Sequence, residues 1–493
     1  MELLWNELGA QRLIYRGTDQ AEVEGMLQPP EGKRAAEILD YKAEVSVETC
    51  RADEGRLNLD GGITVTVVAA EESGGVFSFT SASAFSHTIT AENVDAGMFV
   101  DAIPSIASLT VRNTSDERLS LSAIINIDCT VTSSSPIRVL SGVSGIADLE
   151  MKSSELKTAR RVELSNETIR LSEEIASEGA DKVLQYAARI SVRDTAFENG
   201  GASISGAVTL NALCMSAEGE LMQLTRSIPF RENIELNGSA DEIYATAELS
   251  RVSVRALGTE FSLIAFDADA EFRVYGMRRG SLSMPLDAFS PSINFNCIRE
   301  NLHLTNSVGG SGMQHSLREN ISVPEGLPDI FTAHYASAAS VVTSVAFNNG
   351  EMTVEGLLIT RLIYRSSGGR LYSFTEDVPF SIGMAAPRES SYAKLRTGCT
   401  ANVTGGGGRT AQIAYSIDAT AEFFGETKVS AVVGIAECEA EPTLSGIVIY
   451  NAAAGETVFD VAKRFRLPSA RVSELNPNIG ETLADGDKVL LMV

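Results

Sequence analysis

The sequence has no long apolar stretch. No segment approaches the roughly 18 consecutive apolar residues of a membrane-spanning helix, so we expect no transmembrane segment. The first residues, Met1 to Glu7, contain neither a basic region nor a long apolar core, so a secretory signal peptide is not expected. Together the two absences predict a cytoplasmic protein.

The residue types that build catalytic and metal sites are scarce. The chain has four histidines in 493 residues, and none has a metal-ligand spacing such as HExxH. The glycine runs at 309–312 and 405–408 lack the lysine and the strand-to-helix context of a phosphate-binding loop. We interpret the second run as a hairpin tip. No Gly-x-Ser-x-Gly motif is present. We therefore expect neither enzymatic activity nor a metal or other cofactor.

Cysteine and basic residues are also few. Six cysteines are spread along the chain without a CxxC pair, and we expect reduced, mostly buried thiols. The 40 basic residues are outnumbered by 65 acidic ones, which gives a net charge of -25. This balance argues against nucleic acid as a partner and against docking on anionic lipid. The hydrophobic content of 44% is sufficient for several buried cores, and the length suggests about three domains.

A repeat divides most of the chain. Segments 59–65, 204–210 and 354–360 align without a gap, and their marker glycines lie 145 and then 150 residues apart. A second glycine follows each marker after 13 residues, and a phenylalanine follows it after 24. In the order marker, second glycine and phenylalanine, the copies read Gly61, Gly74 and Phe85, then Gly206, Gly219 and Phe230, then Gly356, Gly369 and Phe380.

Each repeat has the pattern of antiparallel β-structure. Apolar and polar residues alternate around the marker glycine, and the second glycine separates two such runs, which predicts a hairpin. Short helices are expected at 33–41 and 180–186, each just before a strand. The fold class is therefore mainly β, with three repeated sandwich-like or barrel-like domains; spacing does not decide between sandwich and barrel.

Two further residue types recur once per repeat. Tyr41, Tyr186 and Tyr335 each open an apolar alternation upstream of the marker glycine. One aspartate lies in a β-patterned run downstream, and we interpret it as structural because a single active site does not require three copies. These aspartates are Asp128, Asp269 and Asp418.

The last fifty residues have a different pattern. After an acidic linker at 437–443, residues 444–493 predict the order strand, helix, helix, strand. The first helix has Thr457 as its N-cap, with Asp460 completing a capping box. Its buried face is predicted to carry Val458, Val461, Ala462 and Phe465.

A second helix is expected to follow Pro468. Ser469 is its predicted N-cap, Val472 and Leu475 are its predicted buried residues, and Asn476-Pro477 ends it.

This C-terminal segment resembles the LysM domain. That family shows a Gly-Asp-Thr turn, an Ile-Ala pair on a helix, an Asn-Pro turn and a closing strand introduced by glycine. Glu456 replaces the usual aspartate, and Phe459 stands where many members have tryptophan. The corresponding segments here are Gly455-Glu456-Thr457, Val461-Ala462, Asn476-Pro477 and Gly486 through Leu490.

The resemblance implies a shallow binding groove, which in many LysM domains holds N-acetylglucosamine chains. The alternative is that these residues only cap a helix and shape a turn. The implied groove residues are Gly455, Glu456, Thr457 and Val458 on one side and Asn476, Pro477 and Ile479 on the other.

The whole arrangement, β repeats followed by a LysM-like end, resembles the SPOCS-domain spore-coat morphogenetic proteins. The first copy is the more divergent, because it lacks the proline before its phenylalanine and has Glu24-Gly25-Met26 in place of the Glu-x-Ile run. The residues that carry the resemblance are the marker glycines with their strands, Pro229-Phe230, Pro379-Phe380, Glu167-Thr168-Ile169 and Glu319-Asn320-Ile321. The predicted domains are 1–140, 141–285, 286–436 and 444–493.

This second resemblance implies a scaffold in the mother cell, at the surface of the forespore. The LysM-like domain would bind a SpoIVA-like coat ATPase, and the repeats would recruit other coat proteins. Binding of peptidoglycan or a chitin-type oligosaccharide is the alternative. For a protein partner, Phe459 and Lys463 lie four residues apart on one helix and match an aromatic anchor beside a cation. The alternative for this pair is that Phe459 packs on the domain and Lys463 is solvated.

Overall fold

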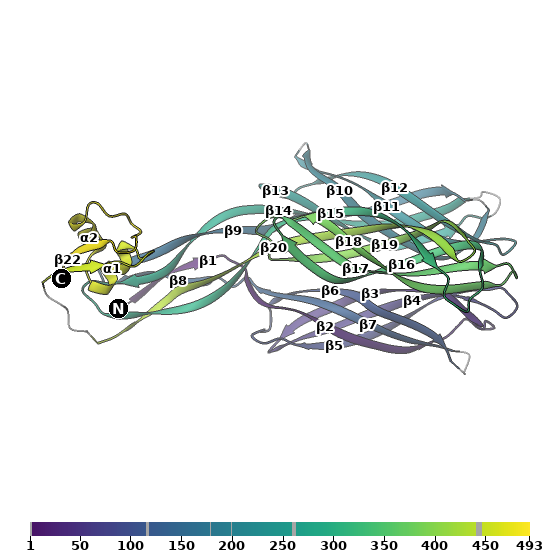
Figure 1. The fold of residues 1–493 in the computed structure, drawn as a ribbon, viewed down its shortest axis with the longest axis horizontal. Helices are drawn as coiled ribbons and strands as arrows, with labels where there is room; N and C mark the ends of the chain where they lie inside the picture. Colours follow the sequence, from purple (N-terminus) through teal and green to yellow (C-terminus); the bar gives the residue numbers. More distant parts are fainter. Residues whose placement is uncertain (1, 115–117, 178, 199, 259–262, 440–445) are drawn as a thin grey trace.

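The computed structural model describes residues 2–114, 118–177, 179–198, 200–258, 263–439 and 446–493. Over these ranges the chain is mainly β-strand, with two short helices near its C-terminus. The strand pairs are antiparallel, so the fold class expected from the sequence is confirmed. Figure 1 shows a body of packed sheets, a narrow stalk and a small module at the far end of the stalk.

Six consecutive strands recur three times, and we call these sets units 1, 2 and 3. Unit 1 contains β2 (Arg12–Leu27), β3 (Glu37–Asp53), β4 (Arg56–Ala70), β5 (Val76–Thr90), β6 (Phe99–Asn113) and β7 (Leu119–Ser133). Unit 2 contains β9 (Glu150–Ala176), β10 (Ala180–Glu198), β11 (Gly201–Ser216), β12 (Leu221–Glu235), β13 (Glu242–Ala256) and β14 (Leu263–Phe289). Unit 3 contains β15 (Phe295–Ser322), β16 (Ile330–Asn348), β17 (Glu351–Ser366), β18 (Leu371–Ala385), β19 (Tyr392–Gly407) and β20 (Thr410–Glu437).

Each unit is a sandwich of two three-stranded arrangements. In unit 1, sheet β3-β4-β5 faces strands β2-β7-β6 across an apolar core. The same pairing recurs as β10-β11-β12 with β9-β14-β13, and as β16-β17-β18 with β15-β20-β19. A single residue pair, Leu304 with Arg12, joins β15 to β2 and merges two arrangements into one six-stranded sheet.

The marker glycine and the phenylalanine 24 residues later are cross-strand partners in all three units. Each ring lies over its glycine, and a Cβ on Gly61 would come within 2.7 Å of the Phe85 ring. On the other side of each marker glycine, a backbone carbonyl of the neighbouring strand also lies close. That strand carries a β-bulge beside the marker glycine in all three units. Glycine is therefore needed here because two neighbours occupy the volume of a side chain.

The second glycine of each repeat has a positive φ, of 87° at Gly74, 85° at Gly219 and 81° at Gly369. Each lies in the tight turn between the two strands that the marker pair joins. The predicted hairpin is confirmed in all three copies, and its glycine supplies the left-handed conformation that the turn requires.

The short helices expected at 33–41 and 180–186 are wrong, because β3 and β10 begin there. β-Bulges interrupt the pairing at Leu39 and at Leu184, and each adds a residue to its strand. The extra residue breaks the alternation of apolar and polar residues, so that two apolar residues follow each other in the sequence. This pattern resembles the spacing of an amphipathic helix.

The third tyrosine marker is displaced by one position. Tyr335 pairs with Ile363, seven residues after its marker glycine, whereas the residues at that position in the other units are Asp40 and Gln185. The expected equivalence of Tyr335 with Tyr41 is therefore wrong in register. A one-residue shift reverses the face of a strand, so Tyr335 is turned away from the core of its own unit.

These displaced positions meet where the three units join. Leu39, Leu184 and Tyr335 share one buried cluster with Val68, Leu213 and Ile363. Asp40 is fully buried beside it and accepts hydrogen bonds from Gln185 Nε2 of unit 2 (2.6 Å) and Ser337 Oγ of unit 3 (3.0 Å). Burial raises the pKa of Asp40, against the opposing charge of Arg361. One carboxylate thus links all three units.

The stalk consists of three two-stranded ribbons. One is formed by β1 (Glu2–Leu8) and β8 (Ile137–Ser144), and the others by the outer halves of β9 with β14 and of β15 with β20. All three ribbons contribute to its buried core, and β9 alone has 27 residues, which corresponds to about 90 Å. Figure 1 shows the stalk projecting from one end of the body.

The predicted domain boundaries after residues 140 and 285 lie within β8 and β14. These boundaries stay predictions. Residues 440–443 of the predicted linker lie outside the described residues, as does Leu444, the predicted start of the last domain. None of the described helices has both the length and the apolar character that crossing a membrane requires.

Candidate interaction site

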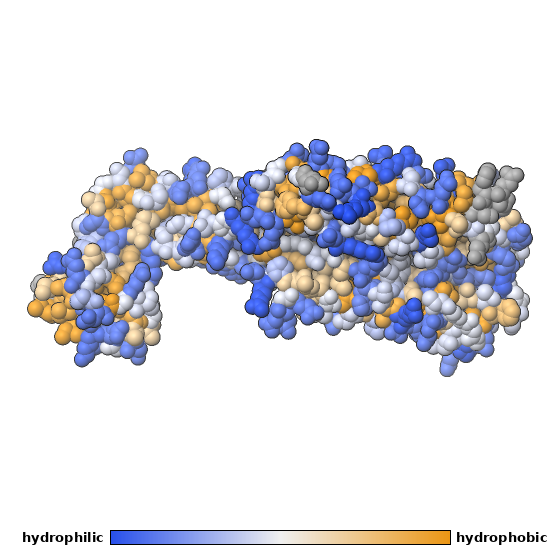
Figure 2. Space-filling model, turned by 90° about the horizontal axis from the view of Figure 1, so that it is seen from above, coloured by the Kyte–Doolittle hydropathy of each residue, from blue (hydrophilic) through white to orange (hydrophobic). Residues whose placement is uncertain are grey.

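The C-terminal module, residues 446–493, has the order predicted from its sequence. It consists of β21 (Ile447–Asn451), α1 (Val458–Phe465), α2 (Ser469–Leu475) and β22 (Lys488–Met492). The two strands pair, and α1 and α2 pack on one face of the pair over a core that includes Val461, Ala462 and Val472. On the opposite face Ile447 and Ile449 are 72% and 64% exposed. Figure 2 shows apolar surface at this end of the molecule.

The first helix begins as predicted. Thr457 Oγ accepts the N–H of Asp460, and the Asp460 carboxylate accepts the N–H of Thr457 at 2.9 Å. Partial burial raises the pKa of Asp460, but the hydrogen bonds from Thr457 and Lys152 outweigh it and leave the pKa below its ordinary value. The capping box is therefore formed with an ionised aspartate.

Glu456 serves the turn in front of this helix. Its carboxylate accepts hydrogen bonds from the Ala453 N–H (2.9 Å) and the Tyr450 hydroxyl (2.8 Å), and it pairs with Arg464. The Ala453 and Tyr450 hydrogen bonds lower the pKa of Glu456. Gly455 has a φ of 83° and donates its N–H to Leu483 O. The replacement of aspartate by glutamate thus keeps a turn-closing carboxylate.

The opposite side of the predicted groove is also bound internally. Asn476 is buried, donates to the carbonyls of Val472 and Leu490, and accepts the Leu490 N–H, each at 2.8 Å. Pro477 is exposed and Ile479 is half-buried against the core. Residues 481–483 hydrogen-bond directly to 455–458 through their backbones, and Val458 is buried. The polar side chains of Glu456, Thr457 and Asn476 therefore have partners within the chain.

Phe459 and Lys463 contact the stalk. The Phe459 ring meets the Phe289 ring edge to face, with centroids 5.0 Å apart. Lys463 Nζ donates to Asp287 Oδ1 at 2.5 Å. The structure thus places this pair side by side on α1, and both side chains are engaged by β14.

The prediction that Ser469 caps the second helix is wrong. The helix begins at Ser469 itself, after Pro468, and Pro468 has no side-chain donor or acceptor for the role. Glu150 of β9 accepts the Ser469 N–H at 2.9 Å and its hydroxyl as well. A carboxylate from the stalk therefore caps α2, where a negative charge favours the helix N-terminus.

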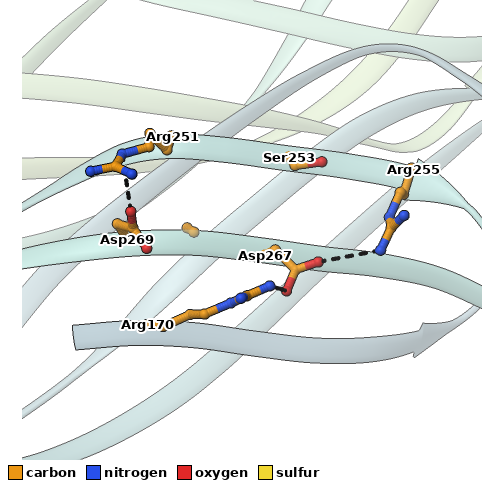
Figure 3. Close-up of a pocket in the computed structure, with 7 residues that line it drawn as sticks. Arg170, Arg251, Ser253, Arg255, Asp267 and Asp269 are labelled. Carbon is orange, nitrogen blue, oxygen red and sulfur yellow. Dashed lines mark hydrogen bonds and ion pairs between the residues drawn. The ribbon is translucent and has the colours of Figure 1, made fainter.

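A pocket lies on the outer face of β9, β13 and β14, as shown in Figure 3. Arg251 pairs with Asp269, while Arg170 and Arg255 converge on Asp267. Arg251 and Arg255 reach the neighbouring strand of their hairpin, and Arg170 comes from a distant part of the sequence; sequence patterns did not indicate these pairs. The arginine side chains are 66–86% exposed, so water screens the pairs.

The three recurring aspartates do not share one role. Asp128 accepts a hydrogen bond from Thr18, and Asp269 pairs with Arg251. Asp418 is 8% exposed, and neither carboxylate oxygen has a hydrogen-bond partner in the described part of the chain. Burial raises the pKa of Asp418 to about 6, although Arg189 and Arg193 of unit 2 oppose the rise.

All six cysteines are free, and three of them, Cys129, Cys214 and Cys399, are buried. Burial raises the pKa of the Cys129 thiol to about 12 and that of Cys214 to about 12. Thiols of this kind are poor nucleophiles at neutral pH.

In a comparison with protein families, residues 34–113 match the model described as "SipL, SPOCS domain". No curated protein and no solved structure matched the chain. The matched segment runs from just before β3 to the last residue of β6, so it contains the marker pair Gly61 and Phe85 and the Gly74 turn. It lies in the first repeat, which is the more divergent in sequence. Residues 34–113 are therefore a SPOCS domain of the SipL family.

Proposed function

We propose that this protein is a non-enzymatic scaffold of the spore coat, with its C-terminal module binding a SpoIVA-like coat ATPase at the forespore surface. The SPOCS domain at 34–113 is the observation that carries the proposal. A long β body and stalk that present a separate module at one end suit a tether between two layers. In this account the protein acts in the mother cell and needs no cofactor.

We further propose that units 2 and 3 are SPOCS-like. The same six strands, the same glycine under a phenylalanine ring and the same positive-φ turn occur in each unit. Each of these features depends on several residues at fixed spacing. Their joint recurrence supports a common domain type, with different outer faces for different coat proteins.

The module is proposed to be LysM-like and to bind protein rather than glycan. The polar side chains of the predicted sugar groove, Glu456, Thr457 and Asn476, already make hydrogen bonds within the chain. A protein partner instead uses apolar and aromatic area. The exposed Ile447 and Ile449 offer such area, and the half-buried Phe459 adds an aromatic ring that Phe289 of the stalk now contacts.

Binding of purified SpoIVA-like ATPase to the immobilised full chain tests this function. Val461→Asp places a charge at a fully buried site of the module and should abolish binding, whereas Ser473→Asp adds the same charge at an exposed site and should not. Equal binding by both variants, or none by the unmodified chain, would contradict the proposal. Sedimentation with purified cell wall tests the glycan alternative, which retention of the chain would support.

A further inference from the structure

The tip of the stalk is shaped to hold the module. Four side chains near the ends of β9 and β14 form it, and they are two cross-strand pairs, Glu150 with Phe289 and Lys152 with Asp287. We call these four residues the stalk tip. Their side chains reach both helices of the module, so the contact involves the part of the module that the proposed function assigns to a partner.

Each residue of the stalk tip has a defined counterpart. Lys152 Nζ lies 3.1 Å from both carboxylate oxygens of Asp460 and 3.3 Å from Thr457 Oγ, at the start of α1. Asp287 accepts from Lys463, and Phe289 packs edge to face on Phe459.

The remaining tip residue, Glu150, caps α2 through Ser469. The tip therefore engages the beginnings of both helices and, on α1, the side chains of Phe459 and Lys463.

The contact has the chemistry of a reversible one. The side chains of its ion pairs retain 33% exposure at Lys152, 34% at Asp460 and 37% at Lys463, while Asp287, which also pairs with Arg299 of the stalk, retains 18%. Ion pairs of this exposure are weak and are screened by salt. The aromatic contact is one ring pair, and its Phe289 ring is buried against the apolar core of the module. A partner that offers its own groups to α1 can therefore displace the tip.

We propose that the stalk tip is an intramolecular competitor for the partner-binding face of α1, so that the module binds its partner only after it is released from the stalk. This inference rests on the proposed function of the module. The competing group is part of the same chain, so its effective concentration is high and the free state is the minor one. The apparent affinity for the partner is then reduced by the fraction of released module.

Charge reversals in the stalk tip test the competition, in the full chain and without changing the module. Lys152→Glu and Asp287→Lys should each raise the affinity for the SpoIVA-like ATPase about tenfold, as expected when a minor state of roughly 10% becomes the main one. Arg138→Glu is the control, because Arg138 is a stalk cation that pairs with Glu7 and changes charge as Lys152→Glu does. It should leave the affinity unchanged.

Hydrogen exchange supplies the second measurement. Release should speed exchange of the Ser469 N–H, which Glu150 accepts, and should do so in both reversal variants but not in Arg138→Glu. Faster exchange with unchanged or weaker affinity would overturn the competition and leave the proposed function standing. Absence of binding by the unmodified chain and by every variant would overturn the proposed function, and the competition with it.

Discussion

At the scale of single residues, the marker glycines are the most constrained positions in the chain. Their constraint is a lack of space. Each lies between a phenylalanine ring and a backbone carbonyl. The need for glycine therefore arises from strand packing, and it recurs in each unit together with the β-bulge of the neighbouring strand. The turn glycines are constrained differently, by their positive φ. Sequence spacing predicted both sets, but the reason for the first required the structure.

Gly61→Ala should destabilise the protein by about 1–3 kcal/mol, because the new methyl group overlaps the Phe85 ring and the Ser46 carbonyl. Gly25→Ala is the matched control, since a Cβ there meets only the Ser83 hydroxyl at 3.9 Å. Thermal unfolding of the two variants compares them. Equal midpoints would show that the strands relax around Gly61 without cost.

Asp418 predicts a pH dependence of stability. Its pKa is about 6 in the folded protein against 3.8 for the ordinary group, so the folded state binds the proton more tightly. The tighter binding of this proton stabilises the fold fully below pH 3.8, and the stabilisation is lost as the pH rises through 6. The difference corresponds to about 3 kcal/mol, at about 1.4 kcal/mol for each pH unit.

Asp418→Asn should remove most of this dependence. Denaturant midpoints at pH 5 and pH 7.5 should differ less for the variant than for the unmodified chain, with the variant relatively more stable at pH 7.5. The same pH slope in both proteins would show that Asp418 is hydrated or paired in solution.

At the scale of elements, the hairpins and the βααβ order were predictable because each depends on local signals. A turn glycine, a capping box and an Asn-Pro stop act within a few residues of one another. The two helices expected before strands were wrong because a β-bulge imitates helical spacing, and the bulge is fixed by the partner strand. The true cap of α2 lies about 320 residues away, at Glu150, which local patterns cannot indicate.

Glu150→Ala should therefore weaken α2. Loss of a helix cap costs about 1 kcal/mol, and here the charge at the helix N-terminus is lost as well. Hydrogen exchange of residues 469–475 should accelerate about fivefold. Glu155→Ala, at an exposed position of the same strand, is the control and should leave exchange in α2 unchanged.

At the scale of the whole molecule, equivalent positions of the three units meet in one buried cluster. Sequence repetition predicted the number of units, but their arrangement depends on one-residue shifts that only the paired strands define. Asp40, Gln185 and Tyr335 occupy the same strand position, yet they are an acid, an amide and a phenol. Because the side chain at this position differs from unit to unit, each unit makes different contacts with the other two.

Asp40→Ala should lower the stability of the whole molecule by about 2–3 kcal/mol, since Gln185 and Ser337 would lose their buried acceptor. Glu22→Ala, at an exposed position of β2, should have little effect. Denaturant unfolding followed by intrinsic fluorescence measures both. A neutral Asp40→Ala would show that the hydrogen bonds of Asp40 add nothing to the stability of the molecule.

The central claim, that the molecule is a coat scaffold positioned by its C-terminal module, is tested most directly in a sporulating cell. A fluorescent fusion of the full chain should form a ring around the forespore in the mother cell, and Val461→Asp should disperse it while Ser473→Asp keeps the ring. A diffuse signal or a signal at the cell wall from the unmodified chain would contradict the account.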